Sequence, residues 1–221
     1  NSDFGMTATV DIYQIDVTNR LSTSSNFVVT DEERAELAAL GVAGAEGITR
    51  VNFFQNDFDT RTKGLDLVLA YAFNAGPGQV NLTGAYNYNK TEVTGGDFAE
   101  NTTSADRFEK GIPEHTANLQ ANYAFGKWDV FGRMRYYGEW RDYSGNSTGD
   151  IFQDFGAMVL FDLGATYQVN DNLSVRVGAE NVFDQYPDEA TYQASRGLIY
   201  SRNAPYDTDG GQYYLRLDLS F

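Results

Sequence analysis

GQYYLRLDLSF, residues 211–221, alternates without a miss between two kinds of side chain. The residues Tyr213, Leu215, Leu217, Leu219 and Phe221 fall on one face, opposite Gln212, Tyr214, Arg216, Asp218 and Ser220. A period of two is the repeat of a β-strand, so the stretch predicts a strand with one apolar and one polar face.

Further stretches upstream repeat this alternation, some more cleanly than others, and they give eight predicted strands in all. The others are 6–17, 49–73, 79–89, 113–125, 127–141, 155–168 and 172–183. Strands of about 10–15 residues reach roughly 30–45 Å, whereas an ordinary strand has about 5–6 residues. When tilted, strands of that length match the hydrocarbon layer of a membrane.

The connections between these strands alternate between short and long. Short turns fall at 74–78, near Gly126 and at 170–171, and the long segments are 18–48, 92–107, 142–154 and 184–210. Short turns on one side and long loops on the other are typical of outer-membrane barrels. The long segments hold 17 of the 31 acidic residues and 5 of the 16 basic ones, which places the acidity at one mouth. The sequence therefore predicts an all-β fold, an antiparallel up-and-down transmembrane barrel.

Composition excludes several classes of protein. The chain has no cysteine, so it offers neither a disulfide framework nor a thiolate metal site. A net charge of −15 argues against a nucleic-acid partner, because nothing would neutralise the phosphates. Mean hydropathy is −0.44, but a barrel strand alternates polar and apolar residues and keeps this average low. Within 18–48 we expect a short helix, since Thr30 and Glu33 form a capping box and Gly41 is a stop signal.

Four strings resemble the C-terminal third of TonB-dependent outer-membrane receptors. NVFDQYP at 181–187 resembles the family's NLFDxxYP motif, and RTKGLDLVLAY at 61–71 resembles its RxxGxxxxxxY strand. VDIYQIDVTNRL at 10–21 resembles DYYxIxxxxRI, and APYDTDGGQYYLRLDLSF at 204–221 resembles the family's final strand and its approach. The four occur in the family's order and cover nearly the whole chain.

The resemblance implies a 22-stranded barrel in which residues 1–221 are the C-terminal portion, so that the plug domain, the TonB box and about 14 strands precede Asn1. It implies the barrel-wall and extracellular-loop part of a receptor for active uptake of a scarce nutrient, such as a ferric siderophore, and not an enzyme. The expected location is the outer membrane of a Gram-negative bacterium. The implied partners are outer-membrane lipid, the plug and remaining strands, the barrel assembly machinery, and TonB through the N-terminal region; no cofactor is implied.

Two sets of residues receive roles from this interpretation. The apolar face of the last strand resembles the assembly signal of outer-membrane proteins, carried by Tyr213, Leu215, Leu217, Leu219 and Phe221. Rings near strand ends suit the aromatic girdles at the two membrane interfaces, with cross-strand packing as the alternative. These rings are Trp128, Tyr136, Trp140, Tyr86 and Tyr88.

Ligand contact is expected from the last long segment, at Tyr192, Arg196, Tyr200 and Arg202. Charges on the polar faces of the strands instead predict an ion-pair network that lines the lumen. Its members are Arg133, Arg135, Arg176 and Arg216 with Asp66, Glu180 and Asp218.

Two motifs receive no chemical role. GNSTG at 145–149 fits the G-x-S-x-G pattern, but that motif needs a strand-to-helix elbow and a positioned histidine, and the only histidine is His115 in another strand. DTDGG at 207–211 is similar to the start of a calcium loop, yet Leu217 stands where the ligating Glu belongs, so a turn is expected. We predict no catalytic and no metal-binding residue.

Two other classes of protein fit part of the pattern. A complete eight-stranded outer-membrane barrel with a structural or adhesion role is one, and coding sequence that extends upstream into a plug would rule it out. A soluble acidic β-sandwich lectin is the other, and failure to partition into vesicles would support it. If the chain is a piece of a larger barrel, its two edges are unpaired, and in isolation it should close on itself, pair with other copies or depend on detergent.

Overall fold

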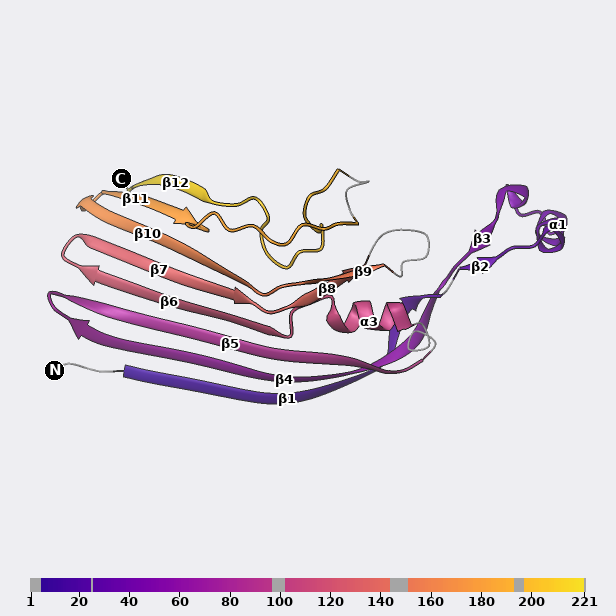
Figure 1. Cartoon of the computed structure of the whole chain (residues 1–221), viewed down its shortest axis with the longest axis horizontal. Coiled ribbons are helices and arrows are strands. Elements are labelled where there is room, and N and C mark those ends of the chain that lie inside the picture. Colours follow the sequence, from indigo (N-terminus) through magenta and orange to yellow (C-terminus); the bar gives the residue numbers. More distant parts are fainter. Residues whose placement is uncertain (1–4, 25, 97–101, 144–150, 193–196, 221) are drawn as a thin grey trace.

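A computed structural model of the chain describes residues 5–24, 26–96, 102–143, 151–192 and 197–220. Its main element is one sheet of eight antiparallel strands whose order in space is their order in the chain (Figure 1). These strands are β1 (Gly5–Thr23), β4 (Phe54–Ala75), β5 (Gly78–Gly95), β6 (His115–Phe125), β7 (Trp128–Tyr137), β10 (Met158–Asn170), β11 (Leu173–Glu180) and β12 (Gln212–Leu219). The predicted up-and-down antiparallel arrangement is confirmed.

Several strand limits differ from the predicted ranges. β1 runs on to Thr23, where it still pairs with Phe54, and β5 runs on to Gly95, so parts of the expected long loops are strand. In these extensions the hydrogen-bonded ladder continues although the apolar alternation has stopped, and a hydrophobic pattern cannot reveal it. The strands expected over 127–141 and 172–183 are shorter and end at Tyr137 and Glu180.

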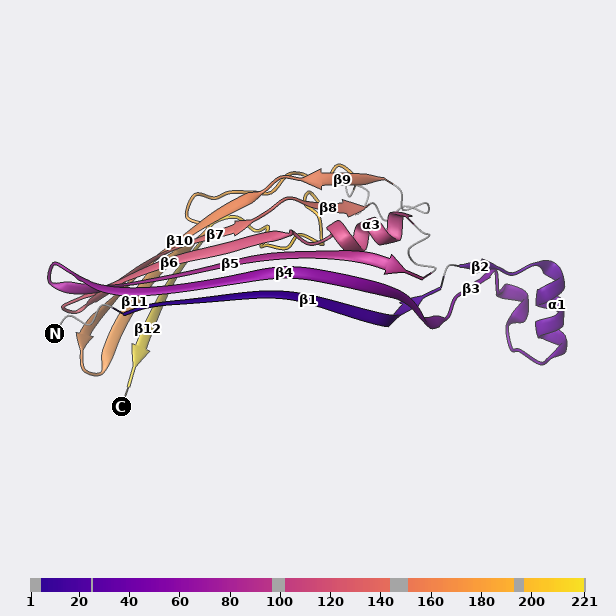
Figure 2. The ribbon, with the colours of Figure 1, turned by 90° about the horizontal axis from the view of Figure 1, so that it is seen from below.

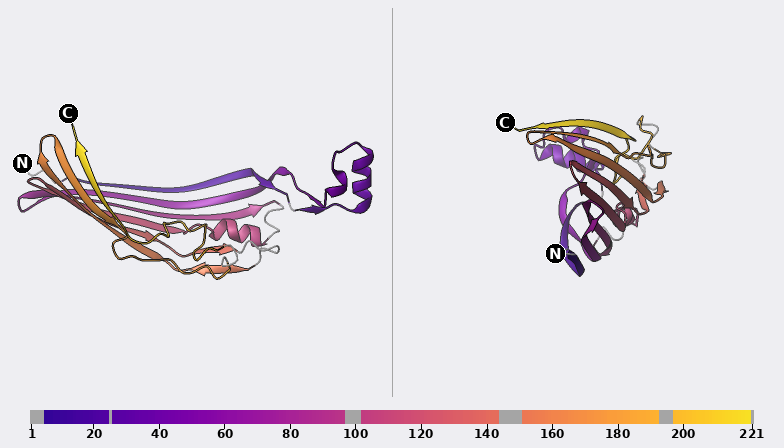
Figure 3. Two further views of the ribbon diagram at one scale, coloured as in Figure 1. Left: turned by 90° about the horizontal axis from the view of Figure 1, so that it is seen from above. Right: turned by 90° about the vertical axis from the view of Figure 1, so that its left-hand side faces the viewer.

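The sheet is curved and open, with β1 and β12 at its two margins (Figure 3). Among the residues that the structure describes, these two edge strands form no hydrogen-bonded pair with each other. A complete eight-stranded barrel, the alternative raised from the sequence, would require that pairing to close. The open sheet therefore does not support it, and the two edges remain available to further strands.

The register places opposite kinds of side chain on the two faces of the sheet. One row of paired residues crosses all eight strands and is apolar, aromatic or glycine throughout: Met6, Tyr71, Leu82, Ala121, Gly132, Leu163, Ala179 and Tyr213. The adjacent row, on the other face, is mostly polar: Thr7, Ala70, Thr83, Gln120, Arg133 and Asp162. The two-faced strand predicted from 211–221 is thus a property of the whole sheet.

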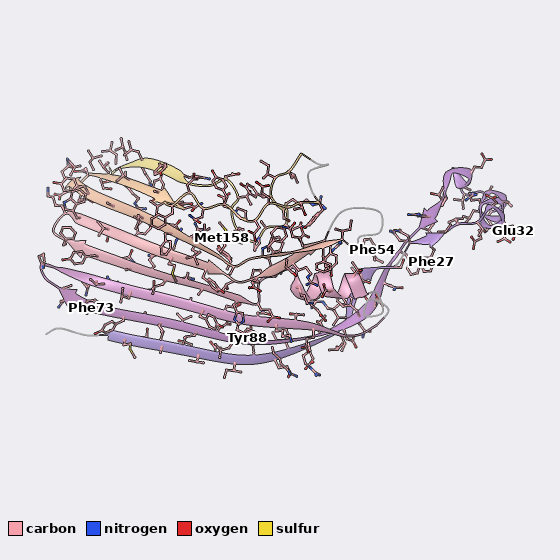
Figure 4. The ribbon with its side chains drawn as sticks, viewed as in Figure 1. Phe27, Glu32, Phe54, Phe73, Tyr88 and Met158 are labelled. Carbon is pink, nitrogen blue, oxygen red and sulfur yellow. The ribbon has the colours of Figure 1, made fainter. Side chains whose placement is uncertain are left out.

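Aromatic rings lie at both ends of the apolar face. At the turn end, Trp128 packs against Tyr167 with ring centroids 4.7 Å apart, and Phe73 lies at the same end (Figure 4). Toward the loop end lie Tyr136 and Tyr88, and the latter stacks on His115 at 4.9 Å. At roughly 3.4 Å per residue, the step from Trp128 to Tyr136 spans about 27 Å, close to the height of the apolar band of an outer-membrane barrel.

Residues 26–53 form an arm that projects beyond the end of the sheet (Figures 1 and 2). It contains β2 (Phe27–Val28) paired with β3 (Arg50–Val51), the helix α1 (Asp31–Ala39) and the 3-10 turn η1 (Ala45–Gly47). The predicted capping box is confirmed: the Thr30 hydroxyl accepts from the Glu33 amide, and the Glu33 carboxylate accepts from the Thr30 amide. Gly41 follows the helix with φ of +80°, as a stop residue should.

The inner face, opposite the apolar one, is covered at its loop end. The cover consists of α3 (Thr102–Lys110), a hairpin of β8 (Trp140–Tyr143) and β9 (Phe152–Phe155), and a strap of residues 181–192 and 197–211. The buried core lies beneath this cover, where Met158 (labelled in Figure 4) and Leu160 of β10 pack on Tyr206. In the same region Trp140 stacks on Phe155. None of the helices formed by the described residues is long and apolar enough to cross a membrane.

Candidate ligand-binding cavity

A cavity of about 860 Å³ opens on the inner face below the cover. Asn87, Asn89 and Thr91 form its floor, because alternate residues of β5 point to this face. Residues of α3 and the turn after it form one wall, and Asp142 and Asn203 form another. Four segments, from β5, from α3 and the turn after it, from β8 and from the strap, therefore build the cavity. Its size lies within the usual range for ligand sites.

Asp142 fixes the wall that the strap contributes. Its carboxylate is 4% exposed and accepts hydrogen bonds from the Ser201 hydroxyl at 2.5 Å and from the Asn203 amide at 3.1 Å. Burial alone would raise the pKa of Asp142, but the hydrogen bonds from Ser201, Asn203 and Tyr192 outweigh it and hold the pKa below its usual value. The charged carboxylate thus fastens the strap to β8.

A second carboxylate, Asp106, fastens α3 to the same hairpin. It accepts from Lys110 Nζ at 2.5 Å, from Arg141 at 3.0 Å and from the Tyr143 hydroxyl. Arg141 also makes a bidentate pair with Asp154 of β9, at 2.6 and 3.0 Å. Burial opposes ionisation of Asp106, but these donors lower its pKa to about 2. Each wall of the cavity is therefore held by a charged hydrogen-bond centre.

A third centre, Asp162 of β10, links the strap to the strands. It is fully buried and accepts from Arg133 Nε at 2.8 Å, from Arg135 Nε and an Arg135 terminal nitrogen at 2.9 and 2.8 Å, and from the backbone amide of Asn181 at 2.9 Å. In the following turn, the Asn181 side chain exchanges two hydrogen bonds with the backbone of Gln185. The NVFDQYP string is thus the structural joint where the strap leaves β11.

The other two strings quoted from the first half of the chain meet in space. Tyr13 of the 10–21 string is paired with Gly64 of the 61–71 string, and its ring lies over the glycine. A Cβ atom on Gly64 would lie 2.1 Å from Tyr13 Cζ, so a larger residue at that position would displace the ring. The same arrangement recurs where Tyr214 covers Gly178. These strings specify close cross-strand packing.

The structure separates the four predicted ligand-contact residues. Tyr192 contributes to the lowered pKa of Asp142, Tyr200 stacks on Tyr186 at 5.8 Å, and Arg202 is exposed on the strap. None of these three lines the cavity, and Arg196 lies outside the described residues. Sequence reasoning missed Asp142 and Arg107, which do line it. The alternation of β5 did signal that Asn87 and Asn89 share the polar face.

The predicted interface aromatics divide into two groups. Trp128, Tyr86, Tyr88 and Tyr136 all lie on the apolar face, as the predicted role requires. Trp140 does not: it is 4% exposed, stacks on Phe155 at 4.5 Å and donates its indole N–H to the Tyr206 hydroxyl. Because β7 ends at Tyr137, Trp140 belongs to the inner hairpin, and its assignment to the interface is wrong.

The predicted lumen network forms around a residue that the prediction omitted. Arg133 and Arg135 bind Asp162, whereas Arg176 donates to the Thr166 hydroxyl at 3.0 Å. Arg216 pairs with Asp218 at 2.7 Å, as expected for this face. Asp66 accepts from the Asn87 amide at 2.5 Å rather than from an arginine.

The segment predicted as an assembly signal is the exposed edge strand. Tyr213, Leu215, Leu217 and Leu219 are 57–76% exposed on the apolar face of β12, and Phe221 lies outside the described residues. The turn predicted at 207–211 is present, with the Asp209 amide donating to the Asp207 carboxylate at 2.9 Å. GNSTG at 145–149 also falls outside the described residues.

Comparison with known proteins gives a family match and a set of similar folds. The family model "TonB dependent receptor-like, beta-barrel" matches residues 1–182, while no curated protein matches. Solved structures with the same fold include FpvA of Pseudomonas aeruginosa PAO1 bound to pyoverdine, with 18% identity and a TM-score of 0.60 over 98% of this chain and 27% of that one.

Two structures from Escherichia coli agree over 98% of this chain. The ferric-catecholate import receptor Fiu of strain K12 has 18% identity and a TM-score of 0.61, with 25% of its chain covered. The outer membrane transporter YddB has 10% identity and a TM-score of 0.64, with 30% of its chain covered. The present chain therefore spans between a quarter and a third of the length of these structures.

Proposed function

The chain belongs to the TonB-dependent receptor-like β-barrel family, and we propose that its eight strands form part of the barrel wall of a nutrient-uptake receptor. Receptors of this family lie in the outer membrane of Gram-negative bacteria. The observation that carries the proposal is the apolar face of the eight-stranded sheet, which carries aromatic rings both at its turn end and toward its loop end. Such a face suits the lipid, because a barrel strand directs alternate residues outward.

The same proposal assigns partners to the two edges of the sheet, to its inner face and to β12. Further strands of the parent barrel continue the sheet at β1 and β12, since an open edge within a membrane would leave backbone groups unpaired. The plug domain faces the polar inner surface, and TonB acts through the N-terminal region of the parent. β12, with its exposed apolar face, is the segment offered to the barrel assembly machinery.

The ligand is proposed to be a scarce nutrient delivered in bulky form, such as a ferric siderophore, and no enzymatic step is assigned. The solved receptors with this fold include one bound to pyoverdine and one described as a ferric-catecholate importer. The inner cavity, held by Asp142 and Asp106, is the proposed contribution of this chain to the ligand site.

Two adjacent cysteine substitutions test the wall. Because the chain has no cysteine, Leu119→Cys and Gln120→Cys each introduce one spin-label site in it, on the apolar and the inner face of β6. In the full-length receptor in lipid vesicles, we expect the label at 119 to collide mainly with oxygen and the label at 120 mainly with a water-soluble nickel complex. Equal access of the nickel complex to both labels would overturn the proposal and favour the soluble sandwich.

A further inference from the structure

We propose that the cavity recognises a ligand carrying a carboxylate, and that Arg107 of α3 is the group that binds it. The inference deepens the proposed function and rests on it, because it gives the ligand of the receptor a chemical class. It follows from how the charged groups around the cavity are already engaged.

Arg107 is the cation of the cavity wall whose hydrogen-bonding edge is open. Its guanidinium carbon lies 5.3 Å from the centroid of the Tyr143 ring, so one face of the group is covered. Among the residues that the structure describes, no carboxylate forms an ion pair with it, whereas Arg133, Arg135 and Arg141 are all paired. A guanidinium held in this way presents its N–H edge in the fork that matches a carboxylate.

The two carboxylates that line the cavity are engaged elsewhere. Asp142 accepts from Ser201 and Asn203, and Glu109 accepts from the Val93 amide at 2.7 Å. Hydrogen bonds to a carboxylate stabilise its charge and reduce what it offers to a ligand. Both carboxylates keep their charge, but their oxygens already accept hydrogen bonds, whereas the N–H edge of Arg107 remains open to a ligand.

The rest of the cavity defines the remainder of the ligand. Phe108, Ile112 and Pro113 give an apolar side next to Arg107. The amide nitrogens of Asn87 and Asn89 donate to Asp66 and Tyr13, which leaves their oxygens to accept from ligand donors. The acidic loops oppose a polyanion within about a Debye length, so a ligand with one carboxylate on an apolar body fits best.

The test uses phenylglyoxal, which modifies free arginine side chains, on the full-length receptor in detergent. The probes are 4-phenylbutyrate and its uncharged amide, and modification of each arginine is followed by mass spectrometry. Arg50, exposed in the arm and away from the cavity, is the internal control. At a concentration about ten times a Kd of about 1 mM, phenylbutyrate should slow modification of Arg107 about tenfold and leave Arg50 unchanged.

The amide should protect neither arginine. Equal protection by acid and amide, equal protection of Arg50, or no protection of Arg107 would each overturn the proposal. Without any probe, Arg141 should react with phenylglyoxal more slowly than Arg107, because Arg141 is paired with Asp106 and Asp154. Faster reaction of Arg141 would contradict the proposal that the Arg107 guanidinium is open.

A cellular experiment separates this proposal from the proposed function. Accumulation of radioactive iron from the host's iron-limited medium is compared for the deletion strain and for strains carrying Arg107→Gln, Arg107→Lys or Arg50→Gln. We expect Arg107→Gln to lower iron uptake about tenfold and Arg107→Lys to restore part of it. Uptake by the Arg50→Gln strain should equal that of the wild type. If the deletion strain takes up as much iron as the wild type, the proposed role in iron uptake is wrong, while the phenylglyoxal result still decides whether the carboxylate site exists. If the deletion lowers uptake but Arg107→Gln behaves as the wild type, the carboxylate site is wrong.

Discussion

The strap and the arm are both long connections at the same end of the sheet, and they fold in opposite ways. The strap lies on the inner face and buries Ala190 and Tyr206, whereas none of the residues 31–39 of α1 in the arm is buried (Figures 1 and 2). Charge does not explain this, since the segments 18–48 and 184–210 each hold five acidic and two basic residues. What differs is whether the strands offer the connection a partner.

The strap finds its partners on β7, β8 and β10. The Asp162 carboxylate accepts a hydrogen bond from the Asn181 amide, and Asp142 accepts from Ser201 and Asn203. Tyr206 of the strap packs on Met158 and Leu160 of β10. The arm instead closes on itself through the capping box and through the stacked rings of Phe27 and Phe53, 5.7 Å apart. The strap should therefore unfold with the wall, and the arm should open independently of it.

Asp162→Asn should have the largest effect, because it breaks the joint between strap and wall. The substitution leaves Arg133 and Arg135 without their carboxylate while Asn181 loses its charged acceptor. Breaking a buried pair by removing one partner costs about 3–5 kcal/mol. Urea unfolding of the full-length receptor in detergent, followed by fluorescence, measures the loss.

Asp218→Asn is the matched control for that loss. It removes a similar pair with Arg216, but the two side chains are 38% and 64% exposed, so the expected cost is below about 1 kcal/mol. Equal costs for the two variants would show that the joint at Asp162 does not couple the strap to the wall.

The pH dependence of unfolding tests how α3 is held to the hairpin, in contrast to α1, which no buried residue ties to the sheet. Its pKa of about 2 lies below the ordinary 3.8, so the charged form contributes stability above about pH 4 and loses it as the pH falls through about 2. The shift corresponds to about 2 kcal/mol that holds α3 to β8. The unfolding free energies of wild type and Asp106→Asn should therefore differ at pH 6 and converge toward pH 2. A difference that stays constant over this range would contradict the role of the Asp106 charge.

The sequence predicts the wall far better than the cavity. Each strand shows its two faces locally, because neighbouring residues must point in opposite directions, and the capping box of α1 is likewise local. Asp142 and Arg107 could not be found this way, since their roles depend on strap and helix residues distant in the chain. Trp140 shows the same limit: its period fits β7, but β7 ends at Tyr137 and the ring turns inward.

The smallest effect is expected in the arm, from Thr30→Ala. Loss of the hydroxyl that accepts the Glu33 amide should cost about 1 kcal/mol, which would speed amide exchange in α1 about fivefold. The free energy of global unfolding should stay unchanged, because α1 buries nothing against the sheet. Thr30→Ser keeps the acceptor and should restore slow exchange. If Thr30→Ala also accelerated exchange in β10 or the strap, the arm would be coupled to the wall, and the contrast between the two connections would fail.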